Sequence, residues 1–156
     1  MKVRYIYSAS VVVETPDVAI VSDPWFSQGA EYGSWFHYPP LPADPVEIIG
    51  KVNVIYISHL HTDHYDPIFL RRYLKRYPDT EILISKMDRN LLASRMKADG
   101  FNPTIASEKK YGETQVYLSV NKGYDYDIDT AMLIVHGDQS VANMNDNRID
   151  EKQIEY

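Results

Sequence analysis

The segment from residue 52 to residue 66 constrains the fold of this chain more than any other part. Its first six residues, 52–57 (VNVIYI), are mostly apolar and rich in β-branched side chains, which predicts a buried strand. The next seven, 58–64 (SHLHTDH), hold three of the chain's five histidines and a carboxylate. Neutral imidazoles and carboxylates are typical ligands of divalent metals such as Zn²⁺, Mn²⁺ and Fe²⁺. The segment therefore predicts a buried strand that ends in a metal-binding loop.

The composition narrows the chemistry of such a site. Because the 156 residues include no cysteine, disulfides are excluded and a metal must be bound by His, Asp or Glu. Structural zinc sites favour thiolates, so the composition favours a reactive site with open coordination positions. A net charge of −6 without a basic run argues against a nucleic-acid surface. No apolar stretch approaches the ~20 residues of a membrane span, and no secretory signal is visible, so we expect a cytoplasmic protein.

Hydrophobic patterning predicts an α/β chain. Strands are expected at residues 3–7, 11–14, 18–22, 52–57, 81–85, 115–119, 131–135 and 140–142. Helices are expected at residues 68–77, opened by Pro67, and at residues 87–99, closed by Gly100. Residues 109–129 are polar and rich in tyrosine, and predict a hairpin or loop around one strand. The alternation of strands and helices in the middle of the chain indicates an α/β layer.

The spacing of the histidines suggests how they share metals. Alternate residues of an extended segment project to the same side, so His59 and His61 can bind one ion. Asp63 and His64 follow in the turn and can face a second position, although Asp63 can instead act as an acid or base. The competing interpretation is a solvated loop that happens to hold three histidines. The spacing, directly after a buried strand, favours the metal site.

The HxHxDH pattern at residues 59–64 resembles the signature motif of the metallo-β-lactamase superfamily. Residues 23–26 (DPWF) are similar to the branch that contains ascorbate-phosphate lactonases and the hydrolase-like domain of CMP-sialic acid hydroxylases. The run from residue 131 to the NMND at 143–146 is similar to paired strands of that branch. This resemblance implies that Asp146 bridges two metals and that Asp23 supports the metal loop from behind.

The resemblance also implies a fold, an α/β (α+β) αββα sandwich. The chain, residues 1–156, looks like one domain that is incomplete at its C-terminus, with a mixed sheet and helices on one face. The family supplies further histidines, whereas only His136 lies between His64 and Asp146, and we expect it in a turn. A half-sandwich would expose the inner face of its sheet, which soluble monomers rarely tolerate. We therefore expect a homo-oligomer or a C-terminal partner segment that covers this face.

The resulting functional hypothesis is a metal-dependent hydrolase. A metal-bound hydroxide would attack an ester, lactone or phosphoester in a small-molecule substrate, which by analogy is sugar-derived or phosphorylated. The expected cofactor is one or two divalent ions, Zn²⁺ first and Mn²⁺ or Fe²⁺ as alternatives. Two other hypotheses stay open: an inactive or partner-dependent half-domain that serves as a subunit, and an iron-binding redox relative.

Three further groups of residues have simpler interpretations. Residues 143–147 faintly resemble a calcium loop, but Arg148 stands where the sharp-turn glycine belongs. Aspartates alternate along residues 124–129, which predicts a solvated strand edge rather than a metal cluster. Residues 27–50 lack periodicity and predict an ordered loop. Aromatic residues there and just before it line a substrate pocket or pack in the core, and the sequence favours neither: Trp25, Trp35, Phe36, His37 and Tyr38.

Overall fold

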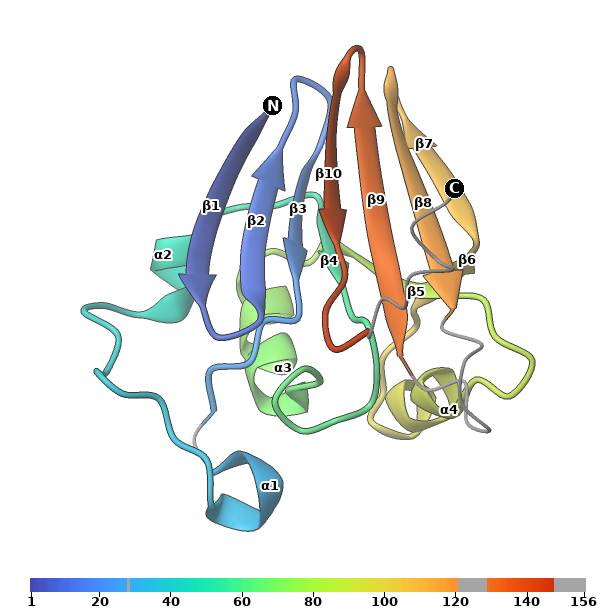
Figure 1. The fold of residues 1–156 in the computed structure, drawn as a ribbon. Coiled ribbons are helices and arrows are strands. Elements are labelled where there is room, and N and C mark those ends of the chain that lie inside the picture. The colour runs from blue at the N-terminus through green and yellow to red at the C-terminus, as the bar shows by residue number, and fades with distance from the viewer. Residues whose placement is uncertain (28, 121–128, 148–156) are drawn as a thin grey trace.

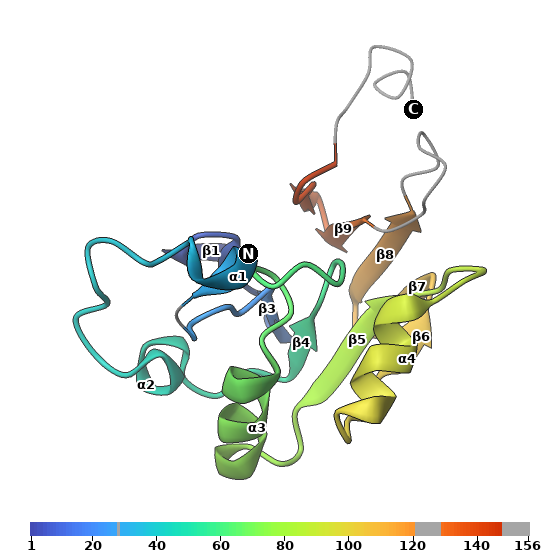
Figure 2. The same ribbon diagram turned by 90° about the horizontal axis from the view of Figure 1, so that it is seen from below.

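The computed structural model describes residues 1–27, 29–120 and 129–147, which form two β-sheets packed face to face (Figure 1). Helices cover the outer face of one sheet, as the view from below shows (Figure 2). The predicted α/β fold with a mixed sheet and helices on one face is confirmed. Within the described residues, no helix is both long enough and apolar enough to cross a membrane.

The larger sheet has six strands in sequence order. They are β1 (Lys2–Tyr7), β2 (Ser10–Glu14), β3 (Ala19–Ser22), β4 (Val54–Tyr56), β5 (Glu81–Ser85) and β6 (Thr104–Ala106). β1 to β3 are antiparallel, and β3 to β6 are parallel. Parallel neighbours need crossover connections: residues 23–53 connect β3 to β4, α3 (Pro67–Arg76) connects β4 to β5, and α4 (Leu91–Ala98) connects β5 to β6.

The smaller sheet is antiparallel, in the order β10-β9-β8-β7. Its strands are β7 (Glu108–Tyr111), β8 (Thr114–Val120), β9 (Thr130–His136) and β10 (Gln139–Asn143). The hairpin expected around residues 115–119 is formed by β7 and β8. Two short helices, α1 (Ala30–Gly33) and α2 (Pro45–Ile49), interrupt the segment that was expected to be a loop.

The two sheets bury a shared apolar layer. Its members, all at most 6% exposed, include Val13, Ile20, Val54, Tyr56, Leu83, Val116, Leu118, Met132 and Ile134. The prediction that the inner face of the mixed sheet is exposed was therefore wrong, because the smaller sheet covers this face. In β8 the inward residues alternate with outward ones such as Tyr117, so the average composition looks polar while every second residue is buried. Within the described residues, no helix contributes to this layer.

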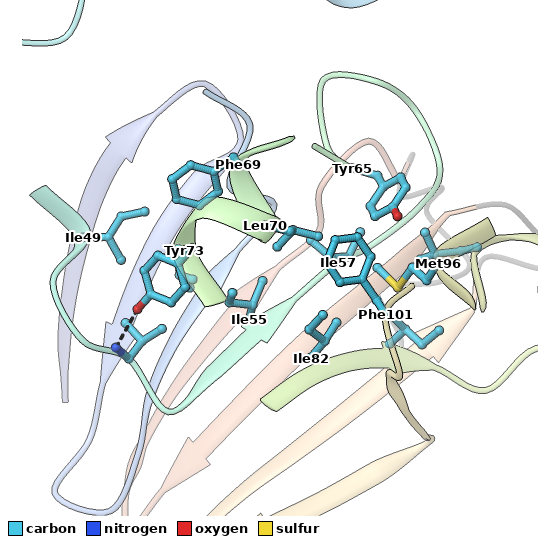
Figure 3. Packing of buried hydrophobic residues seen from close by; sticks show 14 of the residues in the cluster. Ile49, Ile55, Ile57, Tyr65, Phe69, Leu70, Tyr73, Ile82, Met96 and Phe101 are labelled. Atoms are coloured by element: carbon cyan, nitrogen blue, oxygen red, sulfur yellow. Dashed lines mark hydrogen bonds between the residues drawn. The ribbon is translucent and has the colours of Figure 1, made fainter. Parts of the chain in front are cut away.

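A second apolar layer joins the mixed sheet to its helices (Figure 3). Leu70 and Tyr73 of α3 and Met96 of α4 are fully buried against the sheet. The Tyr73 hydroxyl accepts a hydrogen bond from the Val52 backbone N–H at 2.9 Å and donates to the Gly50 carbonyl at 2.7 Å. This layer holds α3 directly behind the loop that follows β4.

The start of α3 is fixed by one carboxylate. Asp66 accepts hydrogen bonds from the backbone N–H groups of Ile68 and Phe69, which is a helix N-cap of about 1 kcal/mol. The same side chain accepts backbone bonds from Phe26 and Ser27. It therefore ties the segment after β3 to the helix that follows the histidine-rich loop.

The chain turns place the predicted site residues at one edge of the sandwich. Asp23 follows β3, and the histidine-rich loop follows β4. β9 begins and β10 ends at the same edge, the lower one in Figure 1. Carboxyl ends of parallel strands are a common location for functional sites in α/β proteins.

Candidate metal centre

A buried aspartate fixes the start of the histidine-rich loop. The Asp23 carboxylate is fully buried and accepts hydrogen bonds from the Ser58 backbone N–H and hydroxyl, both at 2.8 Å. Asp23 adopts a positive φ of 41°, which is strained for a residue with a side chain. The Asp23 side chain thus holds the loop at the end of β4.

His59 is oriented by partners on the side away from the centre. Its ring is 1% exposed, and Nδ1 lies 2.9 Å from Ser58 Oγ and 3.2 Å from Asp129 Oδ1. On the other side, Nε2 lies 2.9 Å from His61 Nδ1 and 3.8 Å from Asp146 Oδ2. The contact between Nδ1 and the carboxylate leaves Nε2 directed into the cluster.

His64 is oriented in the same way by a different carboxylate. Its Nδ1 lies 3.1 Å from Asp23 Oδ2, while Nε2 lies 3.6 Å from Asp63 Oδ2 and 3.5 Å from Asp146 Oδ2. Metal-binding histidines usually donate their outer N–H to a carboxylate or carbonyl, which fixes the tautomer and directs the other nitrogen at the metal. Both buried histidines have this arrangement.

The donor atoms converge closely enough for a metal ion. One ligand atom each from His59, His61 and Asp146 lie within 4.8 Å of one another. Zn–N bonds of about 2.0–2.1 Å in tetrahedral geometry place two nitrogens about 3.3 Å apart, close to the 2.9 Å between His59 Nε2 and His61 Nδ1. The nitrogen and oxygen donors of the cluster therefore suit a borderline divalent ion.

The carboxylates around His64 control its charge. Burial favours the neutral ring, but the hydrogen bond and charge of Asp23, with the charges of Asp63 and Asp146, outweigh it and raise the pKa of His64 to about 9. In the metal-free protein His64 is therefore protonated at neutral pH and offsets part of the negative charge. Since a metal ligand must be deprotonated, metal binding here would release this proton.

The structure brings together all the residues that the sequence singled out for the site. His59 Nε2 faces His61 and Asp146, and His64 Nε2 faces Asp63 and Asp146, while Asp23 lies behind His64. These residues come from the β4 loop, the end of β3 and the segment after β10.

One residue of the site was missed. Asp129 was expected at a solvated strand edge, but it is 8% exposed and lies against His59, so that prediction was wrong. Asp125 and Asp127 lie outside the described residues. The available signal was position: Asp129 comes directly before the apolar run of β9, at the sandwich edge where the histidine-rich loop begins.

The other two histidines of the chain lie elsewhere. His136 ends β9, with Nδ1 3.0 Å from Thr114 Oγ1 and 3.4 Å from Asp17 Oδ2. At ~3.3 Å per residue, it is about 20 Å from the start of β9. His37 packs against Tyr7 and Trp25, at ring-centroid distances of 4.5 and 4.1 Å. Neither histidine reaches the centre in the described part of the chain.

A cavity of about 480 Å³ opens beside the centre. Its lining residues are Glu31, Tyr32, His59, Leu60, His61 and Thr62. The Glu31 backbone N–H donates to Thr62 Oγ1 at 3.0 Å, and that hydroxyl donates to Glu31 Oε1 at 3.1 Å. Ligand pockets typically have volumes of about 300–1,000 Å³, so a small molecule fits here.

The aromatic residues near residues 25–38 differ in burial, and whether any of them lines a substrate pocket stays a prediction. Trp25 is 5% exposed and belongs to the core. Trp35, Phe36 and Tyr38 are between 52% and 90% exposed. These three residues line a separate open depression together with His37, rather than packing in the core.

Sequence comparison finds distant relatives that are longer than this chain. No family model matches. A protein of Mycolicibacterium smegmatis, provisionally named as a Rieske 2Fe-2S iron-sulfur protein, is 28% identical over 95% of this chain. The cytidine monophosphate-N-acetylneuraminic acid hydroxylase of Asterias rubens is 27% identical over 86%. The matches cover 30% and 21% of these relatives, so the chain spans less than a third of their length.

Structure comparison shows the fold class. A possible metal-dependent hydrolase from Veillonella parvula matches with a TM-score of 0.70 and 13% identity, covering 94% of this chain and 63% of that one. The metallo-β-lactamase fold protein YhfI from Bacillus subtilis gives 0.56 and 16%, covering 94% and 57%. CmlA, a diiron β-hydroxylase from Streptomyces venezuelae, gives 0.57 and 20%, covering 91% and 28%. The fold is metallo-β-lactamase-like, and its neighbours include metal-dependent proteins.

Proposed function

We propose that this chain forms the metal centre of a metal-dependent hydrolase. The observation that carries the proposal is the convergence of His59, His61 and Asp146, whose ligand atoms lie within 4.8 Å of one another. The outer nitrogens of the two buried histidines contact carboxylates, so the inner nitrogens are directed at a common point.

Each residue has a role in this proposal. His59 and His61 would hold one ion, Asp63 and His64 a second, and Asp146 would lie between them. When bound, divalent ions such as Zn²⁺, Mn²⁺ or Fe²⁺ supply a hydroxide nucleophile at neutral pH and stabilise developing negative charge. Alternatively, Asp63 would accept or return a proton instead of binding an ion, because its carboxylate is 14% exposed and lies beside His64.

The proposed substrate is a small molecule that enters the cavity beside His61. An ester, a lactone or a phosphoester suits the chemistry of the centre, and a sugar-derived or phosphorylated compound is the first class to try. The volume of about 480 Å³ supports a substrate of this size.

The test combines metal analysis with hydrolysis. Protein purified without added metal is analysed for zinc, manganese and iron, reloaded with each ion, and assayed on a panel of esters, lactones and phosphoesters. We expect activity that chelation removes and one ion restores. A protein that binds none of these ions at micromolar concentration would refute the proposal.

A second proposal is that activity requires further protein. Only three of the five histidines reach the centre, and the match covers 63% of the hydrolase structure. Tyr117 and Leu133 on the outer face of the smaller sheet are 44% and 38% exposed, which supports a second copy or a C-terminal segment as partner. Light scattering measures the oligomeric state, and hydrolysis by the monomeric chain alone would contradict the dependence.

A third proposal, oxidation at an iron centre, is supported by the likeness to CmlA, whose name describes a diiron β-hydroxylase. Nitrogen and carboxylate donors also suit iron. Iron retained after anaerobic purification, with no hydrolysis by the zinc form, would favour this function over hydrolysis.

A further inference from the structure

We propose that Asp129 and Thr130, at the start of β9, position the metal ligands of both sheets relative to one another. This inference rests on the proposed metal centre. Thr130 is the first residue of β9 in the smaller sheet and Asp129 directly precedes it, whereas the histidine-rich loop follows β4 of the mixed sheet. Their hydrogen bonds reach both the loop and the segment that carries Asp146.

Thr130 is the junction of these hydrogen bonds. Its fully buried hydroxyl donates to the Ser58 carbonyl at 2.7 Å, immediately before the first histidine of the loop. Because the hydroxyl has one hydrogen, the Tyr56 hydroxyl donates to Thr130 Oγ1 at 2.6 Å. The last residue of β4, Tyr56, and the first residue of the histidine-rich loop, Ser58, are thereby both attached to the opposite sheet.

The backbone of Thr130 reaches the carboxylate end of the centre. Its carbonyl accepts a hydrogen bond from Asn145 Nδ2 at 2.9 Å. Asn145 adopts a positive φ of 50°, and Asp146 follows it directly. The strained turn that directs Asp146 at the histidines is therefore anchored on Thr130.

Asp129 orients His59 from the same position. Its Oδ1 accepts a hydrogen bond from the Thr130 N–H at 2.7 Å and lies 3.2 Å from His59 Nδ1. Its Oδ2 is buried without a partner among the described residues. A carboxylate held in this way favours the tautomer with hydrogen on Nδ1, which leaves Nε2 free to bind an ion.

Each sheet thus supplies one carboxylate behind one histidine. Asp23 of the mixed sheet supports His64, and Asp129 of the smaller sheet supports His59. The relative placement of the two inner nitrogens therefore depends on how the sheets are docked, and Thr130 fixes that docking at the site.

The experiment compares Asp129→Leu and Thr130→Val with wild type. Thr130→Ser keeps the hydroxyl and should retain wild-type behaviour. Thr114→Val is the matched control, since Thr114 is also a fully buried, hydrogen-bonded threonine at the start of a strand of the smaller sheet. Co²⁺ binding is measured by calorimetry and by the ligand-field spectrum, and urea unfolding of the metal-free proteins measures stability.

We expect Asp129→Leu and Thr130→Val to weaken Co²⁺ binding by roughly 10- to 100-fold, the range for partners behind metal ligands. Thr114→Val should lose stability without this loss of affinity. Wild-type Co²⁺ affinity in both variants, or a loss no larger than that of Thr114→Val, would overturn the inference.

A second measurement does not depend on metal binding. In the metal-free wild type, ¹⁵N–¹H spectra should show a downfield Nδ1–H resonance for His59, because Nδ1 lies 2.9 Å from Ser58 Oγ and 3.2 Å from the Asp129 carboxylate. Asp129→Leu should move or remove it. If wild type binds no Co²⁺, the proposed function fails. The role of Asp129 is still decided, because an unchanged resonance in Asp129→Leu refutes it.

Discussion

The two ends of β9 carry similar residues with different outcomes. One end has a histidine, an aspartate and a threonine in contact, and so does the other: His59, Asp129 and Thr130, and His136, Asp17 and Thr114. The His59 side chain is 1% exposed, whereas that of His136 is 25% exposed. Among residues 1–27, 29–120 and 129–147, only at the His59 end do further nitrogens and carboxylates face the free ring nitrogen. A histidine paired with an aspartate does not by itself indicate a metal site, and the converging donors are what favour one at His59.

The largest expected effect tests this difference directly. His59→Ala removes a proposed metal ligand, so Zn²⁺ affinity should fall by more than the roughly 100-fold that is typical when a hydrogen-bond partner of a metal ligand is removed. His136→Ala, which removes the same ring at the other end of β9, should bind Zn²⁺ like wild type. Calorimetry measures both, and equal losses in the two variants would show that the centre has been misplaced.

Substitution of an aspartate at each end of β9 should affect the number of bound metal ions differently. Asp146→Asn removes the charge proposed to lie between two ions, so the number bound should fall from two toward one. Asp17→Asn should leave it unchanged. Metal analysis after equilibrium dialysis provides the measurement. A wild-type stoichiometry of one would exclude the bridging role of Asp146.

Removing bound metal with a chelator should lower the free energy of unfolding only through the His59 end of β9. An ion that binds only the folded state, present at a free concentration of 100 times its dissociation constant, adds about 2.7 kcal/mol to the free energy of unfolding. Adding a chelator should remove this increment from wild type and from His136→Ala alike, and hardly affect His59→Ala. Urea unfolding with and without chelator measures it. A chelator effect in His59→Ala as large as in wild type would contradict the assignment.

Alkaline pH should weaken the metal-free protein at the His64 end. The folded-state pKa of His64 is raised from 6.5 to about 9, so its contribution is fully present below pH 6.5 and is lost as the pH rises through 9. Because one pKa unit corresponds to 1.36 kcal/mol, the loss is on the order of 1–3 kcal/mol. His64→Gln should flatten this part of the stability profile in chelator-treated protein. A wild-type profile that is flat from pH 6 to 10 would contradict the stated charge of His64.

Acid should produce the smallest effect, at the opposite end. The hydrogen bond from Thr114, partly opposed by desolvation, lowers the pKa of Asp17 below 3.8, with further help from the Glu113 N–H and the charge of His136. A depressed pKa contributes stability above 3.8 that is lost as the pH falls through the folded value. Thr114→Val should therefore reduce the acid dependence of unfolding while leaving the alkaline dependence intact. Urea midpoints between pH 2.5 and 5 test this, and an unchanged acid profile would reject the role of Thr114.

The metal loop was predictable because its information is local. A β-branched run followed by histidines at alternate positions indicates both a strand and the direction of its side chains. The structure indeed places His59 and His61 with facing nitrogens 2.9 Å apart. Asp146 was identified only through a family resemblance, since 82 residues separate it from His64 and no spacing rule connects them.

The role of Asp129 was missed because it depends on docking between sheets, which its position before an apolar run does not specify. In sequence it ends an alternating acidic run, which is typical of a solvated edge. Its burial follows from β9 packing across β4, a long-range contact that hydrophobic periodicity does not encode. The sequence did not reveal for the same reason that the smaller sheet covers the inner face of the mixed sheet. The alternating polarity of its strands predicts strands but not the sheet to which they belong.

The short helix α1 lines the cavity beside the centre, and its residues would influence which compounds enter that cavity in related proteins. In the part of the chain that the structure describes, two hydrogen bonds that involve side chains join α1 to the histidine-rich loop. Both are between Glu31 and Thr62. The carboxylates that orient His59 and His64 lie on the other side, in the sandwich itself. The residues at the entrance of the cavity and the carboxylates that orient the candidate metal ligands therefore belong to separate parts of the fold. Exchange of a few residues around α1 would change which molecules are admitted while the chemistry behind them persists.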